Sequence, residues 1–197
     1  MSRIAAVCFV VLLGIASSLA CTQSAPSTAA QTAAAPPAGP VTPPVTDADK
    51  IKSAMSAAPA AIADEATVID MTSMATLKTG TNGWTCFPDM PATPGADPMC
   101  VDQNGMEWAN AWMNHQDPPK GKIGFAYMLA GGSDASNTDP FATEPQPGAK
   151  WVDTGPHVMV LNIGDSFAGY PTTAANTKVP YVMFPGTPYA HLMIPVK

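Results

Sequence analysis

The first 46 residues of this 197-residue chain cannot form a packed core, which restricts folding to the part that follows. Residues 22–46 read TQSAPSTAAQTAAAPPAGPVTPPVT and contain no charged and no aromatic residue. Such a segment buries too little apolar surface to offset the entropy of ordering it. We therefore expect residues 21–46 to be a disordered linker. Residues 47–197 are long enough to form a single globular domain with one core.

Residues 1–20 have the pattern of a secretory signal peptide. Arg3 is their only charged residue, residues 4–15 form an apolar run, and small residues follow up to Ala20. The apolar run is too short to span about 30 Å of hydrocarbon, which takes about 20 helical residues. We therefore expect the chain to be exported and this segment to be removed.

The end of this segment, Ser18-Leu19-Ala20-Cys21, resembles the lipobox of bacterial lipoproteins. In that family the cysteine becomes the lipidated first residue of the mature chain, although the usual leucine three places before it is Ser18 here. The resemblance implies a lipid anchor on Cys21 and a location in the periplasm or at the outer membrane. Cleavage by an ordinary signal peptidase, giving a secreted protein, is the alternative, and a buried N-terminal helix is a third possibility.

The four cysteines support export. Cys8 lies in the apolar run of the signal segment, and Cys21 is assigned to the lipid. Cys86 and Cys100 remain as one pair, and disulfides persist in an oxidising compartment. We expect this pair to bond and to contribute about 3 kcal/mol in the chain-entropy model. Two free buried thiols are the alternative, and a zinc site would need further ligands at short spacing.

Charge limits the classes of partner. The formal net charge is −6, and charged residues make up only 12% of the chain. An acidic chain of this kind is poorly suited to nucleic acid or to anionic lipid headgroups. The expected partners are a membrane, reached through the lipid anchor, and an unidentified protein or small-molecule ligand.

The hydrophobic pattern predicts an α+β fold, with a mostly antiparallel sheet of six or seven strands, about two helices and one disulfide-closed loop. Helices are expected at 47–57 and 104–114, where Asn104 and Glu107 resemble a capping box. Expected strands are 66–71, 75–78, 83–87, 122–129, 151–153, 157–163, 180–184 and 189–196. Irregular loops are expected at 88–100 and 131–148, and a tight turn at 185–188.

Four strings resemble an uncharacterised family of secreted bacterial proteins. They are NGWTC at 82–86, TPGADPMC at 93–100, SNTDPFATEP at 136–145 and GTPYAHLM at 186–193. The resemblance covers most of residues 51–197, and it implies a secreted domain and supports the expected boundaries of 47–197. It implies no activity, cofactor or catalytic residue.

A repeated His-x-Met motif is the sharpest chemical signal. It occurs at His157 with Met159 and at His191 with Met193, each pair inside an expected strand. Residues two apart share a face of a strand, so both pairs line one site if the strands are neighbours. The opposite faces are aliphatic and are expected to form the core.

Two imidazoles and two thioethers suit Cu(I), and the arrangement resembles that of periplasmic copper chaperones. Two alternatives remain open. Both pairs can be structural, since methionine is a common core filler, or a histidine can act as a catalyst without metal.

Gly164-Asp165-Ser166-Phe167 resembles the nucleophile block of the GDSL esterases. A serine nucleophile needs a histidine base within hydrogen-bond reach. The Asp-x-x-His block of that family is absent, because Pro188 stands where the aspartate would precede His191. A polar turn after a strand is the alternative.

Acidic side chains gather in the loop that follows the expected strand at 122–129. Asp134, Asn137, Asp139 and Glu144 could supply oxygen ligands to calcium or form the rim of a ligand site. Their spacing is not that of an EF-hand, and a solvated, turn-rich loop is the alternative. The acids around the cysteine pair are expected to serve as caps and turn formers; they are Asp89, Asp97, Asp102 and Glu107.

These features favour a tethered binding or accessory module without chemistry of its own, and they lean against an enzyme. One alternative is a copper-binding protein or small metal-dependent enzyme that uses His157 and His191. The other is a small serine hydrolase that uses Ser166.

Overall fold

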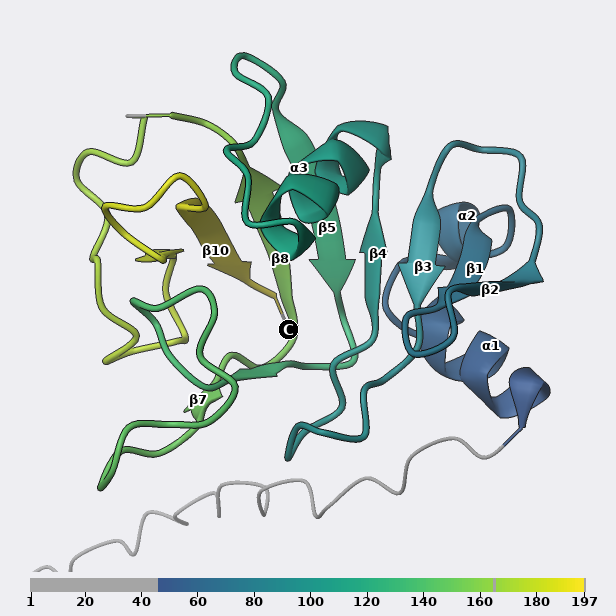
Figure 1. Ribbon diagram of the computed structural model, residues 1–197, viewed down its shortest axis with the longest axis horizontal. Coiled ribbons are helices and arrows are strands. Elements are labelled where there is room, and N and C mark those ends of the chain that lie inside the picture. The colour runs from purple at the N-terminus through teal and green to yellow at the C-terminus, as the bar shows by residue number, and fades with distance from the viewer. Residues whose placement is uncertain (1–45, 165, 197) are drawn as a thin grey trace, which may run out of the picture. The chain divides into compact units, whose positions relative to one another are not determined.

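A computed structural model describes residues 46–164 and 166–196 (Figure 1). The predicted signal peptide and the predicted linker up to residue 45, with the predicted lipidation site Cys21, lie outside these residues. Within the described residues, no helix has both the length and the apolar character needed to cross a membrane. The described residues form three helices, an eight-stranded sheet and a two-stranded sheet.

The larger sheet has the strand order β2-β1-β3-β4-β5-β8-β10-β9. Its strands are β1 (Thr67–Asp70), β2 (Ala75–Lys78), β3 (Thr85–Phe87), β4 (Met99–Val101), β5 (Gly124–Met128), β8 (His157–Leu161), β9 (Tyr181–Met183) and β10 (His191–Pro195). The pairing of β1 with β3 is parallel, and the other pairings are antiparallel. The α+β class is confirmed, but the expected antiparallel sheet of six or seven strands is wrong, because the sheet is larger and mixed.

The extra strand of the larger sheet, β4, begins at the end of the 88–100 region that was expected to be an irregular loop. It is only three residues long and follows a proline-rich stretch, so its sequence gives little strand signal. The smaller sheet pairs β6 (Ser133–Asp134) with β7 (Val152–Asp153). Strand β6 also lies in a region that was expected to be an irregular loop, whereas the expected strands are all present, with ends that differ by a few residues.

The predicted disulfide between Cys86 and Cys100 is confirmed. The two cysteines lie directly opposite each other in the β3–β4 pair, with their Cα atoms 4.0 Å apart. Both are fully buried. The bond therefore ties the two strands at the centre of the sheet.

Helix α1 (Asp47–Met55) begins where its cap predicts, because the Thr46 hydroxyl accepts a hydrogen bond from the backbone N–H of Asp49 at 3.1 Å. The helix ends before Pro59, as expected. Pro59 then serves as the N-cap of a short second helix, α2 (Ala60–Ala63), which the sequence analysis did not predict.

Helix α3 (Gln103–Met113) begins slightly earlier than expected. Its N-cap is Asp102, whose carboxylate accepts a hydrogen bond from the backbone N–H of Gly105 at 2.7 Å. Asn104 instead donates to the carbonyl of Ile123, and Glu107 pairs with Lys122. The expected capping box is therefore wrong, because a better-placed carboxylate already satisfies the first turn.

The helices cover opposite faces of the sheet. Ala54 of α1 packs with Cys86 and Cys100 in one core cluster, whereas Trp108 of α3 packs in the other. The neighbours Ala126 and Tyr127 on β5 contact different clusters, as alternate residues of a strand must. Figure 1 shows α3 lying across β4 and β5.

The aliphatic faces of β8 and β10 form less of the core than predicted, although Leu192 on β10 is buried. Val158 and Val160 are only half-buried, whereas Met159 and Met193 belong to the core cluster under α3. The reason is that α3 and the loops after β5 and β9 cover the His/Met face. The face of β8 and β10 that carries the two His-x-Met pairs is therefore buried in the interior.

Candidate functional site

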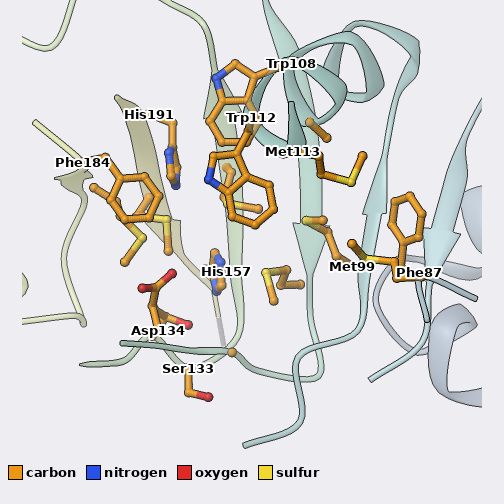
Figure 2. A pocket seen from close by; sticks show the side chains of 18 residues that line it. Phe87, Met99, Trp108, Trp112, Met113, Ser133, Asp134, His157, Phe184 and His191 are labelled. Atoms are coloured by element: carbon orange, nitrogen blue, oxygen red, sulfur yellow. The ribbon is translucent and has the colours of Figure 1, made fainter. Parts of the chain in front are cut away.

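A cavity of about 160 Å³ lies between α3 and the larger sheet (Figure 2). Its walls consist mainly of thioethers and aromatic rings. Seven of the twelve methionines of the chain line it: Met71, Met99, Met113, Met128, Met159, Met183 and Met193. This concentration in one place gives the cavity a soft, polarizable and adaptable surface.

The strands supply one wall of the cavity through side chains on a single face. Strands β8 and β10 are antiparallel neighbours, and Met159 lies directly opposite Met193. His157 is two residues before Met159, and His191 is two residues before Met193, so all four side chains point to the same side. The structure therefore brings together the four residues of the predicted His/Met site.

Helix α3 supplies the facing wall through Trp108, Ala109, Trp112 and Met113. These positions are one and four residues apart, so they form one face of the helix. The indole N–H of Trp112 also donates to the carbonyl of Pro140 at 2.8 Å. This bond holds the 131–148 loop beside the helix.

Hydrogen bonds fix the tautomer of both buried histidines. The ring atom Nδ1 of His157 lies 2.7 Å from the carbonyl oxygen of Gly155, and that of His191 lies 3.0 Å from the carbonyl oxygen of Tyr189. A carbonyl oxygen only accepts, so Nδ1 carries the hydrogen in each ring and donates it. The other ring atom, Nε2, is therefore left with a free lone pair.

Neither Nε2 atom has a hydrogen-bond partner among the residues that the structure describes. Both histidines line the cavity, and their exposed fractions are only 1% for His157 and 2% for His191. Figure 2 shows the two rings at different levels of the cavity. The cavity thus contains two buried nitrogen lone pairs that no donor in the described part of the chain satisfies.

Burial keeps both imidazoles neutral. Desolvation lowers the pKa of His157 below its ordinary value, against the opposing effect of the Gly155 carbonyl. Desolvation is also the main reason that the pKa of His191 is lowered to about 4; the hydrogen bond to the Tyr189 carbonyl opposes this shift, and repulsion from His157, were that ring protonated, acts in the same direction as desolvation. At neutral pH both lone pairs remain available to a cation or to a hydrogen-bond donor.

The His157 end of the cavity is its more polar end. Ser133, Asp134 and Thr154 line the cavity there, and both hydroxyls lack a hydrogen-bond partner in the described part of the chain. Burial raises the pKa of Asp134 to about 6, although the backbone N–H groups of Ser136 and Ala135 partly stabilise its carboxylate. A cation bound nearby would favour the ionised form of this carboxyl.

The other residues of the predicted rim loop do not join Asp134. Asp139 and Glu144 are exposed, and the amide of Asn137 donates to the carbonyl of Thr172 at 3.0 Å. Within residues 46–164 and 166–196, no three His, Cys, Asp or Glu side chains gather in a way that could hold a metal ion. Only the first part of this loop therefore contributes to the cavity.

Ser166 lies elsewhere, in an open groove on the surface. The groove is also lined by Asn162, Phe167 and Thr187, and no histidine is present among its described lining residues. The backbone N–H of Ser166 donates to the carbonyl of Ile163 as part of a turn. The described residues of this groove therefore provide no histidine that could act as a base for Ser166.

No family model, curated protein or solved structure matches this chain.

Sequence reasoning missed two methionines of the cavity that lie beside the histidines. Met128 is directly opposite His157 across β5 and β8, and Met183 is directly opposite His191 across β9 and β10. Each lies in an expected strand, so its strand was predicted. Its position opposite a histidine was not, because that depends on the order and register of strands far apart in the sequence.

Proposed function

We propose that this protein is an exported, lipid-anchored binding protein that holds Cu(I) in its His/Met cavity and carries out no turnover. One observation carries the proposal: two neutral, buried imidazoles present unpartnered Nε2 atoms to a cavity lined by seven methionines. Imidazole and thioether are the donors that Cu(I) prefers. Export and the anchor on Cys21 rest on the sequence of residues 1–21.

The cavity is costly as a purely structural feature. A buried acceptor without a partner typically costs about 1–3 kcal/mol. Leucine and phenylalanine would fill the same space without lone pairs and in better-defined rotamers. Two such histidines among seven thioethers therefore suit a site that gains its missing partners when it is loaded.

The donor set favours a soft cation over zinc or calcium. Zinc sites use thiolates or several histidines, and calcium sites use six or more oxygens. Here Cys86 and Cys100 are bonded to each other, and among the described residues Asp134 is the one carboxylate that lines the cavity. Both imidazoles donate Nδ1–H to backbone carbonyls, which is how metal-binding histidines are usually oriented.

A small apolar molecule with a hydrogen-bond acceptor is the second candidate. The supporting observation is that the Trp108 indole N–H and the Thr154 hydroxyl, which also line the cavity, have no partner among the described residues. An apolar cavity of about 150 Å³ can hold a benzene-sized guest. Such a guest would use the same space, so the two candidates exclude each other.

A Cu(I) competition titration separates these candidates. The full chain is produced with its own N-terminal segment, purified without chelators, and titrated under reducing, oxygen-free conditions against a chromophoric Cu(I) chelator. We expect the protein to remove Cu(I) from the chelator, and His157→Gln and His191→Gln to weaken this uptake. Zn²⁺ and Ca²⁺ should not raise its thermal stability.

His115→Gln is the matched control, because His115 is the third histidine of the chain and is exposed outside the cavity. Its uptake should equal that of the wild type. A folded protein that takes up no Cu(I), or that loses uptake only with His115, would refute the proposal. Stabilisation by benzene or indole but not by Cu(I) would instead favour the apolar guest.

A further inference from the structure

The strand register separates the two histidines along the sheet. His191 lies opposite Leu161 on β8, whereas His157 lies opposite Pro195 on β10. Four residues of β8 therefore separate their levels, which is about 14 Å at about 3.4 Å per residue. Side chains of a strand stand roughly perpendicular to the sheet, and Figure 2 shows the two rings at separate levels of the cavity. A single ion with bonds of about 2 Å cannot bridge nitrogens held that way.

Each histidine instead has its own pair of thioethers. His157 has Met128 directly opposite on β5 and Met159 two residues further along β8. Directly opposite residues have Cβ atoms about 5 Å apart, so their side chains meet. A Cβ atom added at Gly132 would lie 3.1 Å from both the His157 ring and the Met128 methyl group, which places these two side chains around the same point.

His191 has an equivalent set on the other side of the cavity. Met183 lies directly opposite it on β9, and Met193 follows two residues further along β10. The two sets meet at the centre, where Met159 lies opposite Met193. We name them the β8 half-site (His157, Met128 and Met159) and the β10 half-site (His191, Met183 and Met193).

We propose that the cavity holds two Cu(I) ions, one in the β8 half-site and one in the β10 half-site, each bound by one imidazole nitrogen and two thioether sulfurs. This inference rests on the proposed function and specifies its stoichiometry. Binding needs no proton release from these donors, because Nδ1 keeps its hydrogen and thioethers are neutral. Each ion would serve as the partner that one of the two buried Nε2 atoms lacks among the described residues.

The two half-sites fill in a defined order. Two cations in one apolar cavity repel each other, so the second ion binds more weakly than the first. Asp134 is two residues from Gly132, and so it lies at the end of the cavity that holds His157 (Figure 2). Its carboxylate favours a cation in the β8 half-site, which therefore fills first.

The test is the number of ions bound by the full chain and by paired methionine variants. The Cu(I) titration should give two ions per chain in the wild type, in two separate steps. Met128→Leu should weaken the first step and leave the second, whereas Met183→Leu should do the reverse. The loss should be about tenfold or more, because changes to residues that only support a ligand already cost that much.

Leucine conserves the volume of methionine, so these variants should fold. Met106→Leu is the control, since Met106 packs against the same core cluster but does not line the cavity. Circular dichroism and thermal unfolding check each protein. His157→Gln and His191→Gln should each reduce the stoichiometry from two ions to one.

One ion per chain, lost in both histidine variants, would overturn the two-site inference and leave the proposed function intact. Equal weakening of both steps by Met128→Leu and by Met183→Leu would also overturn it. No Cu(I) uptake at all would instead refute the proposed function itself.

Discussion

Acidification is expected to destabilise the protein through His191. The ring is buried and neutral in the folded state, with a pKa lowered to about 4, whereas an unfolded histidine titrates near 6.5. Below pH 6.5 the unfolded state therefore binds a proton that the folded state does not accept until about pH 4. The stabilising contribution is complete above pH 6.5 and is lost as the pH falls through this window.

The magnitude follows from the difference between these two pKa values. Each unit corresponds to about 1.36 kcal/mol, so lowering the pH from 7 to 4.5 should cost about 2–3 kcal/mol through His191 alone. The lowered pKa of His157 adds a loss of the same sign. Asp97 and Asp134, whose pKa values are raised to about 6 chiefly by burial, contribute with the opposite sign in this range.

A comparison with His191→Gln isolates the histidine, because the other groups titrate in both proteins. The free energy of unfolding is measured by urea denaturation at pH 7 and pH 4.5 without metal. The wild type should lose about 2–3 kcal/mol more than the variant over this interval. Equal losses in the two proteins would show that His191 is not held neutral by burial, and the reasoning about its free lone pair would fail.

Three further changes test the fold around the cavity. Replacing Cys86 and Cys100 by serine should lower the free energy of unfolding by about 3 kcal/mol, and an unchanged value in urea would contradict the disulfide. Asp102→Ala should lower the free energy of unfolding by about 1 kcal/mol, because α3 loses its N-cap. Glu107→Ala should lower it less, because the ion pair of Glu107 with Lys122 is exposed. A larger loss in Glu107→Ala than in Asp102→Ala would contradict the role of Asp102 as the cap. Gly132→Ala should cost about 1–3 kcal/mol, because the added Cβ would lie 2.6 Å from a buried hydroxyl, and a thermal shift near zero would contradict that crowding.

The local features of the site could be predicted from the sequence, but the residues that surround it could not. The two-residue spacing of His157 with Met159, and of His191 with Met193, placed each pair on one strand face. The apolar alternation around them predicted the strands. These features need only the strand period, which a short sequence window contains.

Strand pairing could not be predicted in the same way. Met128 becomes a neighbour of His157 because β5 pairs with β8, although about thirty residues of chain separate the two strands. The parallel pairing of β1 with β3 around the β1–β2 hairpin is likewise a property of the whole sheet. Such contacts depend on the combined packing of many segments, for which no local pattern exists.

The prediction of which face of β8 and β10 is buried was also wrong. Aliphatic residues such as Val158 and Val160 normally mark the core face of a strand. Here α3 and its neighbouring loops cover the face that carries the histidines and methionines, so the polar rings are buried. The disagreement between hydrophobic pattern and burial falls at the candidate site, where local rules are most often broken for function.

X-ray absorption at the copper edge of the Cu(I)-loaded full chain tests the central claim most directly. The account predicts a sulfur shell at about 2.3 Å and a nitrogen shell at about 2.0 Å, in a ratio near two to one, the bond lengths usual for a first-row metal with these donors. The sulfur shell should weaken in Met128→Leu and in Met183→Leu but not in Met106→Leu. A spectrum with only oxygen and nitrogen neighbours would place the copper outside the methionine-lined cavity and would contradict the account.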